Sequence, residues 1–201
     1  TRRQDKRAAV PSGLSEASLS KSSLPCQLNQ MLSVETIQCA NEHEALLAHV
    51  RQDTPADDII AALKLPRPRA LICLNGGTAG LAEALKMQLR HLLVDGLARF
   101  AAENAITLVT GGTDAGIFSL LGEGLAKWGC QAPCIGVTPS ATVTWPGRSE
   151  GETLLEPHHS HFIVVDGKDW GDETLKMYSV AQALSRHCPS IAVFAVGGNV
   201  L

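Results

Sequence analysis

The order of apolar and polar positions along the chain predicts strands that alternate with helices. Short continuous apolar runs are typical of parallel strands covered on both faces, and apolar residues that recur every three or four positions indicate helices packed on one side. The apolar runs predict strands at residues 70–74, 106–110, 133–138, 161–166 and 191–196. The helical period predicts helices at residues 81–100, 117–128 and 173–186.

The first part of the chain has a weaker pattern. Residues 32–39 alternate loosely between apolar and polar positions, which predicts a strand at a sheet edge. Helices are predicted around residues 42–51 and 56–63, and Pro66 and Pro68 then break the chain. Residues 1–25 are rich in serine and lack an apolar period, so we expect a disordered tail before one domain over residues 26–201.

Strands that alternate with helices predict a Rossmann-like α/β fold, a three-layer sandwich with a mainly parallel central sheet. Three of the predicted strands end in a glycine pair, and in a parallel sheet these ends meet at the edge where ligands bind. Glycine lets the backbone turn tightly and approach a ligand, and the N-terminus of the following helix can hold a phosphate. We therefore expect a phosphorylated ligand, with simple tight turns as the alternative. The three turns contain Asn75, Gly76, Gly77 and Thr78; Thr110, Gly111, Gly112, Thr113 and Gly116; and Gly197, Gly198 and Asn199.

Charge and composition exclude several classes of partner and of enzyme. The formal net charge is −3 at pH 7, which gives no reason to expect nucleic acid or an anionic membrane as a partner. No apolar run approaches the roughly 18 residues of a membrane helix, and the polar start shows no secretory signal, so we expect a cytoplasmic protein without direct membrane insertion. The six cysteines are irregularly spaced, which favours reduced thiols over a disulfide scaffold. Neither a G-x-G-x-x-G fingerprint at a strand end nor a P-loop is present, which disfavours an NAD dehydrogenase or a P-loop NTPase.

Several polar residues outside the glycine turns have two interpretations each. His158, His159 and His161 invite a metal site, but only two of them share a strand face and no other ligand has a convincing spacing, so we expect no metal. His161 either hydrogen-bonds at the ligand cleft or is a structural histidine. Asp166 either accepts from a ribose hydroxyl or starts a turn.

The polar segment 139–160 is long for a loop in a compact domain, and such loops are usually functional or mobile. Trp145 in this segment either stacks on a base or anchors the loop to the core. Arg148 either pairs with a phosphate or is a solvated surface charge.

Specific motifs follow one another in a distinctive order: Leu65-Pro-Arg-Pro-Arg69, a strand with Asn75-Gly-Gly, Val109-Thr-Gly-Gly-Thr-Asp-Ala-Gly116, Pro133-Cys-Ile-Gly-Val137, and His158-His-Ser-His-Phe-Ile-Val-Val-Asp166. Over about residues 65–201 this succession resembles the LSDAT branch of the SLOG superfamily, which includes the N-terminal domain of TRPM (melastatin-type) channels and related bacterial proteins.

The resemblance implies a Rossmann-like sensor domain for nucleotides or their derivatives. In the channels the ligand is ADP-ribose-like, and in bacteria the domain is thought to sense nucleotide signals, sometimes beside a membrane effector module. A homo-oligomer or such an effector in the parent protein is left open, and no cofactor is implied. The resemblance places the ligand at the three glycine turns, with His161 and Asp166 nearby.

The superfamily also contains phosphoribohydrolases of the Lonely-guy type, which use a Pro-Gly-Gly-x-Gly-Thr-x-x-Glu block. Here the corresponding strand ends in Val196-Gly-Gly-Asn-Val-Leu201, with no preceding proline and no glutamate before the end of the chain. This departure weighs against an enzyme, and we expect a domain truncated at its C-terminus. The alternatives to a nucleotide sensor are therefore a nucleotide N-glycosidase or phosphoribohydrolase, and a purely structural domain.

Overall fold

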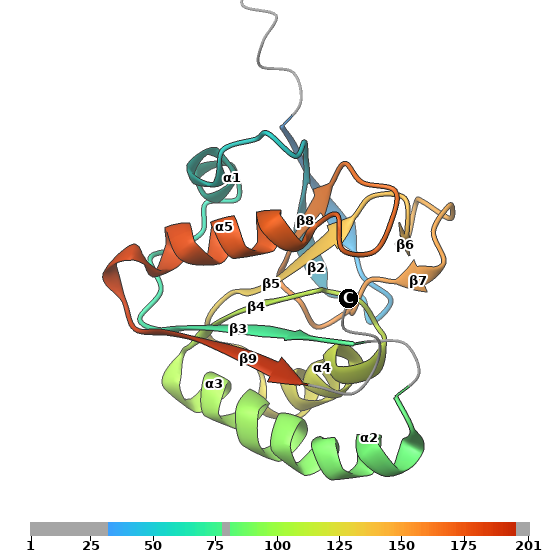
Figure 1. The fold of residues 1–201 in the computed structure, drawn as a ribbon, viewed down its shortest axis with the longest axis vertical. Helices are drawn as coiled ribbons and strands as arrows, with labels where there is room; N and C mark the ends of the chain where they lie inside the picture. Colours follow the sequence, from blue (N-terminus) through green and yellow to red (C-terminus); the bar gives the residue numbers. More distant parts are fainter. Residues whose placement is uncertain (1–31, 78–80, 196–201) are drawn as a thin grey trace, which may run out of the picture.

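A seven-stranded sheet forms the centre of the computed structural model, which describes residues 32–77 and 81–195. The strands lie in the order β1-β2-β8-β5-β4-β3-β9, and only the pair β1–β2 is antiparallel. The predicted α/β sandwich with a mainly parallel sheet is confirmed (Figure 1). Along the sheet the strands are β1 Ser33–Gln38, β2 Glu44–Val50, β8 His161–Val165, β5 Cys134–Pro139, β4 Thr107–Thr110, β3 Leu71–Gly76 and β9 Ser190–Ala195.

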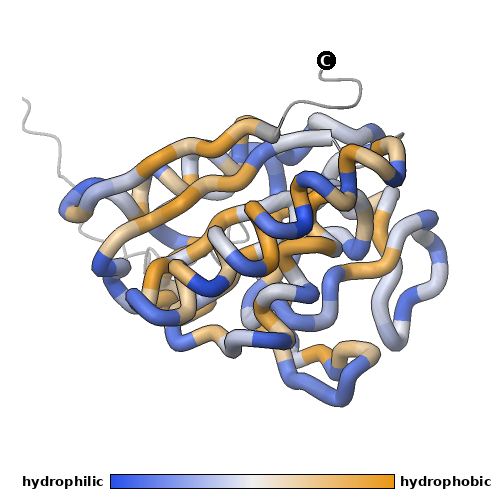
Figure 2. Tube along the Cα trace, turned by 90° about the horizontal axis from the view of Figure 1, so that it is seen from below, coloured by the Kyte–Doolittle hydropathy of each residue, from blue (hydrophilic) through white to orange (hydrophobic). Residues whose placement is uncertain are grey.

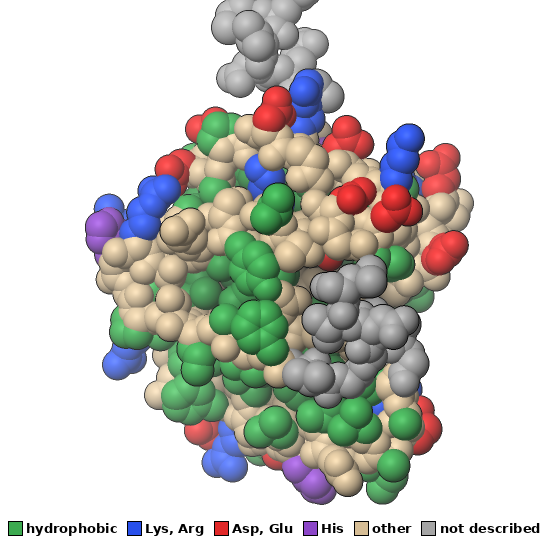
Figure 3. Space-filling view, viewed as in Figure 1, with side chains coloured by type: hydrophobic (Ala, Val, Ile, Leu, Met, Phe, Trp, Pro, Cys, Tyr) green, Lys and Arg blue, Asp and Glu red, His purple; other side chains and the backbone are tan. Residues whose placement is uncertain are grey.

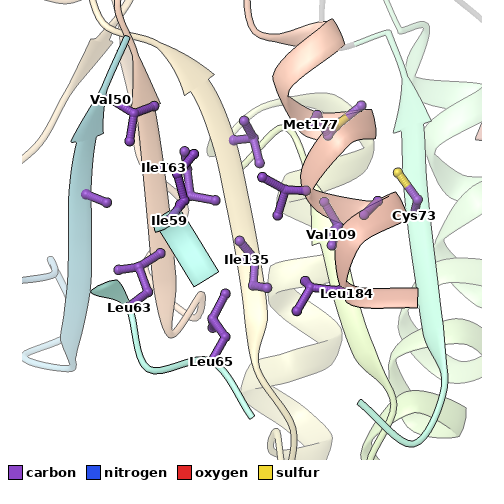
Figure 4. Close-up of a cluster of buried hydrophobic side chains, with 14 of the residues drawn as sticks. Val50, Ile59, Leu63, Leu65, Cys73, Val109, Ile135, Ile163, Met177 and Leu184 are labelled. Carbon is purple, nitrogen blue, oxygen red and sulfur yellow. The ribbon is translucent and has the colours of Figure 1, made fainter. Parts of the chain in front are cut away.

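Helices cover both faces of the sheet. On one face lie α1 (Ala56–Ala62) and α5 (Thr174–Leu184), which a 3-10 turn (Ser185–His187) extends. Figure 4 shows Met177 and Leu184 of α5 beside Val109 and Ile135 of the sheet. The other face carries α4 (Gly116–Trp128) and one continuous helical segment made of α2 (Glu83–Arg90), a π-helix (His91–Ala98) and α3 (Arg99–Asn104).

The segment between β5 and β8 replaces a helix over the β1–β2–β8 part of the sheet. It carries the short parallel strands β6 (Val143–Thr144) and β7 (Thr153–Leu154). Val143, Trp145 and Leu155 are buried there against side chains of β1, β2 and β8. The predicted long loop is thus a packed part of the core.

The strand and helix predictions hold with one exception. Residues 42–51 were expected to be helical, and this was wrong, because residues 44–50 form β2. Their Glu, Ala and Leu side chains favour a helix in isolation. In the fold β2 pairs with β1 on one side and β8 on the other, and its buried residues reach the cores on both faces, so tertiary context decides.

The distribution of hydropathy follows these layers. In Figure 2 the strands carry long hydrophobic stretches, whereas hydrophilic stretches lie mainly in loops and outer turns. Within residues 32–77 and 81–195, no helix is long and apolar enough to cross a membrane. The predicted tail, residues 1–25, lies outside the described residues.

Candidate functional site

The parallel strands bring their carboxyl ends to one edge of the sheet, called here the carboxyl edge. From β3 the chain adds β4, β5 and β8 in one direction and then returns to place β9 on the other side of β3. Such a reversal of strand order marks the usual ligand crevice of open α/β sheets. The ends of β3, β4 and β9 that precede the three predicted glycine turns therefore lie at the edge where a ligand is expected.

The predicted residues of the first turn lie at the end of β3. Asn75 and Gly76 are its last two residues, and Gly77 follows. The Asn75 side-chain amide donates to the hydroxyl of Tyr178 on α5. Asp166 follows β8 at the same edge with its side chain exposed, so it remains accessible to a ligand. Four predicted residues lie outside the described residues: Thr78, Gly197, Gly198 and Asn199.

The glycines of the second turn are required by packing inside the protein. A Cβ on Gly111 would lie 2.4 Å from the ring of Phe118. Gly112 has a φ of +68°, and a Cβ there would lie 2.6 Å from the Cα of Gly136. The Gly112 N–H also donates to Thr110 Oγ1 at 2.9 Å. The Gly112 amide is therefore engaged within the protein, and the glycine pair lets two segments of backbone meet.

Free amides do occur one step further along, at the start of α4. Its N-cap residue is Ala115, which has no side chain able to cap the helix. The N–H of the preceding residue, Asp114, donates to the Leu154 carbonyl. Among the described residues, the N–H groups of Ala115, Gly116 and Ile117 have no hydrogen-bond acceptor. Within the described ranges, the positive end of the α4 dipole thus has no acceptor from the protein.

Two buried hydroxyls near this helix end also lack partners within the part of the chain that the structure describes. Thr113 is 1% exposed and Thr138, the next-to-last residue of β5, is 0% exposed. A buried hydroxyl without a hydrogen bond costs about 1–3 kcal/mol. Such groups are rare in native structures and ask for an explanation, of which a bound ligand or ordered water is one.

A buried hydrogen-bond chain stands behind the second turn. Thr110 Oγ1 lies 2.7 Å from His159 Nε2, and His159 Nδ1 lies 2.7 Å from Glu156 Oε2. His158 Nδ1 is 2.8 Å from the other oxygen of Glu156. Thr110 Oγ1 thus accepts from the Gly112 amide and is hydrogen-bonded to His159, whose other ring nitrogen is hydrogen-bonded to Glu156. The chain fixes the end of β4 relative to the segment that precedes β8.

The ionised state of Glu156 completes this network. Burial by itself would raise the pKa of Glu156, but the hydrogen bonds and charges of His159 and His158 outweigh it and lower that pKa. A Cβ on Gly122 of α4 would lie 2.0 Å from Glu156 Oε1, so glycine makes room for the carboxylate. Sequence reasoning missed Glu156 altogether. No group of three or more His, Cys, Asp or Glu in the described ranges is arranged to hold a metal ion.

His161 is the first residue of β8 and pairs with Ile135 near the start of β5, so it lies two strands away from β4. Its Nδ1 contacts Ser160 Oγ at 2.9 Å, and burial lowers its pKa. These contacts agree with the structural interpretation of His161.

Comparison with known proteins assigns the chain to a family. The family model described as "SLOG in TRPM, prokaryote" matches residues 69–201. The mouse transient receptor potential cation channel subfamily M member 2 is 27% identical over 146 residues, which cover 58% of this chain and 10% of that protein. The subfamily M member-like 2 of Nematostella vectensis is 28% identical over 143 residues, or 57% of this chain and 9% of that protein.

Among solved structures, the structural-genomics target TM1055 is similar, with a TM-score of 0.45 and 19% identity over 64% of this chain and 61% of that one. This chain spans about a tenth of the length of the two channel proteins. The region matched by the family model begins just before β3 and includes the N-terminus of α4 with its free amides. Because that model covers more than half of the chain, the protein belongs to the prokaryotic SLOG-in-TRPM family.

Proposed function

We propose that this domain binds a nucleotide derivative of the ADP-ribose kind at the N-terminus of α4 and acts as a cytoplasmic sensor that signals to a partner or effector region. One observation carries the proposal: among the described residues, the buried Thr113 hydroxyl and the amides of Ala115, Gly116 and Ile117 all lack a partner, close together in the sequence. The oxygens of a phosphate group can accept from donors of this kind. The helix dipole adds to the attraction.

The surroundings suit the rest of a nucleotide derivative. Asn75 and Tyr178 are hydrogen-bonded to each other at the end of β3 and offer an amide and a partly exposed aromatic ring. The exposed carboxylate of Asp166 follows β8 at the same edge and could accept from ribose hydroxyls. A phosphate, a base and a ribose would thus each meet a suitable group along the carboxyl edge.

Thr113→Val tests the site with little risk to the fold. Valine has nearly the same shape and removes a hydroxyl that has no partner, so the free protein should be as stable as the wild type or about 1 kcal/mol more stable. Affinity for ADP-ribose, measured by calorimetric titration, should fall about tenfold. The matched control is Thr142→Val, because Thr142 Oγ1 donates to the Pro139 carbonyl: it should lose stability and keep affinity.

Two outcomes contradict this proposal. Unchanged affinity in a folded Thr113→Val variant would remove the hydroxyl from the site, and an absence of binding to any nucleotide by folded protein would favour a structural domain. The hydrolase alternative is tested with the same samples. Release of free adenine from AMP would show that the protein is a phosphoribohydrolase rather than a sensor.

A further inference from the structure

A cavity lies away from the proposed nucleotide site. It has a volume of about 460 Å³ and opens between the end of β1 and the segment that carries β6 and β7. Its walls include Ile37, Cys39, Trp145, Arg148, Leu154 and Leu155. The volume lies within the range of small-molecule sites. None of the residues of the second glycine turn or of the start of α4 lines it.

The cavity is preformed, because the turn at its mouth is held in place. Trp145 and Arg148 exchange two backbone hydrogen bonds, and the Thr144 hydroxyl donates to the Arg148 carbonyl. Trp145 is buried, and its ring lies 5.9 Å from the ring of His49 on β2. Trp145 therefore anchors the segment, as one of its two predicted interpretations had it, and also presents a fixed aromatic wall.

Arg148 gives the otherwise apolar cavity one positive charge. Its side chain is 27% exposed, and its guanidinium lies 5.0 Å from the centre of the Trp145 ring. Within residues 32–77 and 81–195 its ion pair is a loose one, 3.8 Å to the highly exposed Glu150. Arg presents a planar fork of donors that matches a carboxylate. The pairing capacity of this guanidinium is therefore largely unused by the protein.

We propose that this cavity is a second ligand site, which takes a small aromatic carboxylate. The aromatic group contacts Trp145, Ile37 and Leu154, and the carboxylate pairs with Arg148. A single guanidinium matches one negative charge, whereas a phosphate dianion would bring a second charge among apolar side chains. Burial raises the pKa of the Cys39 thiol, which is thus a neutral, apolar part of the wall.

The proposal is tested with 1-naphthoate and its neutral analogue 1-naphthamide, titrated calorimetrically into the full chain. Naphthoate should bind saturably and about tenfold more tightly than naphthamide, because only the carboxylate gains a charge-assisted hydrogen bond. Arg148→Met should lower the affinity for naphthoate about tenfold and leave the affinity for naphthamide unchanged. The matched control is Arg99→Met, since Arg99 also lies 5.0 Å over a tryptophan, Trp128, outside the cavity.

Location is tested separately by fluorescence. The chain has three tryptophans, and the double variant Trp128→Phe/Trp170→Phe leaves Trp145 as the sole reporter, whose emission naphthoate should quench. Leu154→Asp, at a half-exposed position, should reduce naphthoate binding more than naphthamide binding. Equal affinity for the two compounds, or unchanged naphthoate affinity in Arg148→Met, would overturn the proposal. Binding should persist in Thr113→Val, which keeps this test independent of the nucleotide site.

Discussion

At the scale of single residues, the carboxyl edge is organised by contacts between positions far apart in the sequence. Thr110 meets His159 and Glu156 through a buried chain of hydrogen bonds. Buried polar groups of this kind are stable only when every member is satisfied. Here each nitrogen and oxygen of the Thr110–His159–Glu156 side chains has a partner, whereas the Thr113 hydroxyl has none among the described residues. This contrast is the reason for proposing Thr113 as a ligand contact.

The lowered pKa of Glu156 predicts how stability depends on pH. The folded-state pKa lies below the value of an unfolded glutamate, about 4.3. The ionised carboxylate therefore stabilises the fold above that value, and this contribution disappears as the pH falls through the folded-state pKa. Urea unfolding should show that the wild type loses more stability between about pH 5 and pH 3 than Glu156→Gln does.

The control for this comparison is Glu103→Gln, because Glu103 forms an exposed pair with Arg99 on α3. It should follow the wild-type pH profile, since exposed pairs contribute little. A Glu156→Gln profile parallel to that of the wild type would contradict the assignment of an ionised, buried Glu156.

Little of this residue-scale detail could be predicted from the sequence. The glycine turns were found because glycine pairs after apolar runs are a local signal. Why glycine is required there depends on packing, because a side chain would clash with Phe118 or Gly136. Glu156 gave no local signal, because its partners become visible only when β4 and the segment before β8 are side by side. The sequence left two interpretations of His161 open, and its position as the first residue of β8 becomes visible only in the fold.

At the scale of elements, α4 combines a missing cap with a preformed start. Ala115 has the extended backbone of a typical N-cap, with φ −148° and ψ 147°, but cannot accept a hydrogen bond from the first turn. The N-cap position is therefore suited to serine in conformation and lacks only the oxygen. A ligand oxygen can take the place of the absent cap.

Ala115→Ser tests this idea. The serine oxygen should accept from a first-turn amide and stabilise the free protein by about 1 kcal/mol. By occupying that donor it should weaken ADP-ribose binding severalfold, measured by calorimetric titration alongside thermal unfolding. Ala82→Ser is the matched control, because Ala82 is the uncapped N-cap of α2: it should stabilise the protein and leave affinity unchanged. Tighter binding by Ala115→Ser would contradict the role of free amides.

Most helices and strands could be predicted because each has its own local pattern of apolar residues. The continuous apolar runs of β3, β4, β5 and β8 became buried strands, and the helical stripe at residues 81–100 became a helical segment that continues to Asn104. β2 was mistaken for a helix because its composition favours one, and only pairing with β1 and β8 reveals the strand. The local hydrophobic pattern therefore predicts helix or strand best where the side chains also have matching intrinsic preferences.

At the scale of the whole molecule, the fold offers three distinct surfaces. The carboxyl edge holds the proposed nucleotide site, and the aromatic carboxylate site lies beside β1. Figure 3 shows hydrophobic side chains gathered over β9 and α5, where Leu175, Ile191 and Phe194 are exposed. β9 pairs only with β3 among the described strands, so this face combines an edge strand with apolar side chains. The fold class was predictable because alternating strands and helices permit few topologies, whereas these surfaces arise only from assembly.

The most direct test of the central claim observes the amides themselves. In ¹H–¹⁵N spectra of the labelled protein, ADP-ribose should produce its largest shifts at the amides of Thr113, Ala115, Gly116 and Ile117, which lie at the start of α4. The Gly112 amide, already bonded to Thr110, should shift less. Saturable binding that leaves the four amides unchanged, or whose largest shifts lie away from the start of α4, would contradict the account.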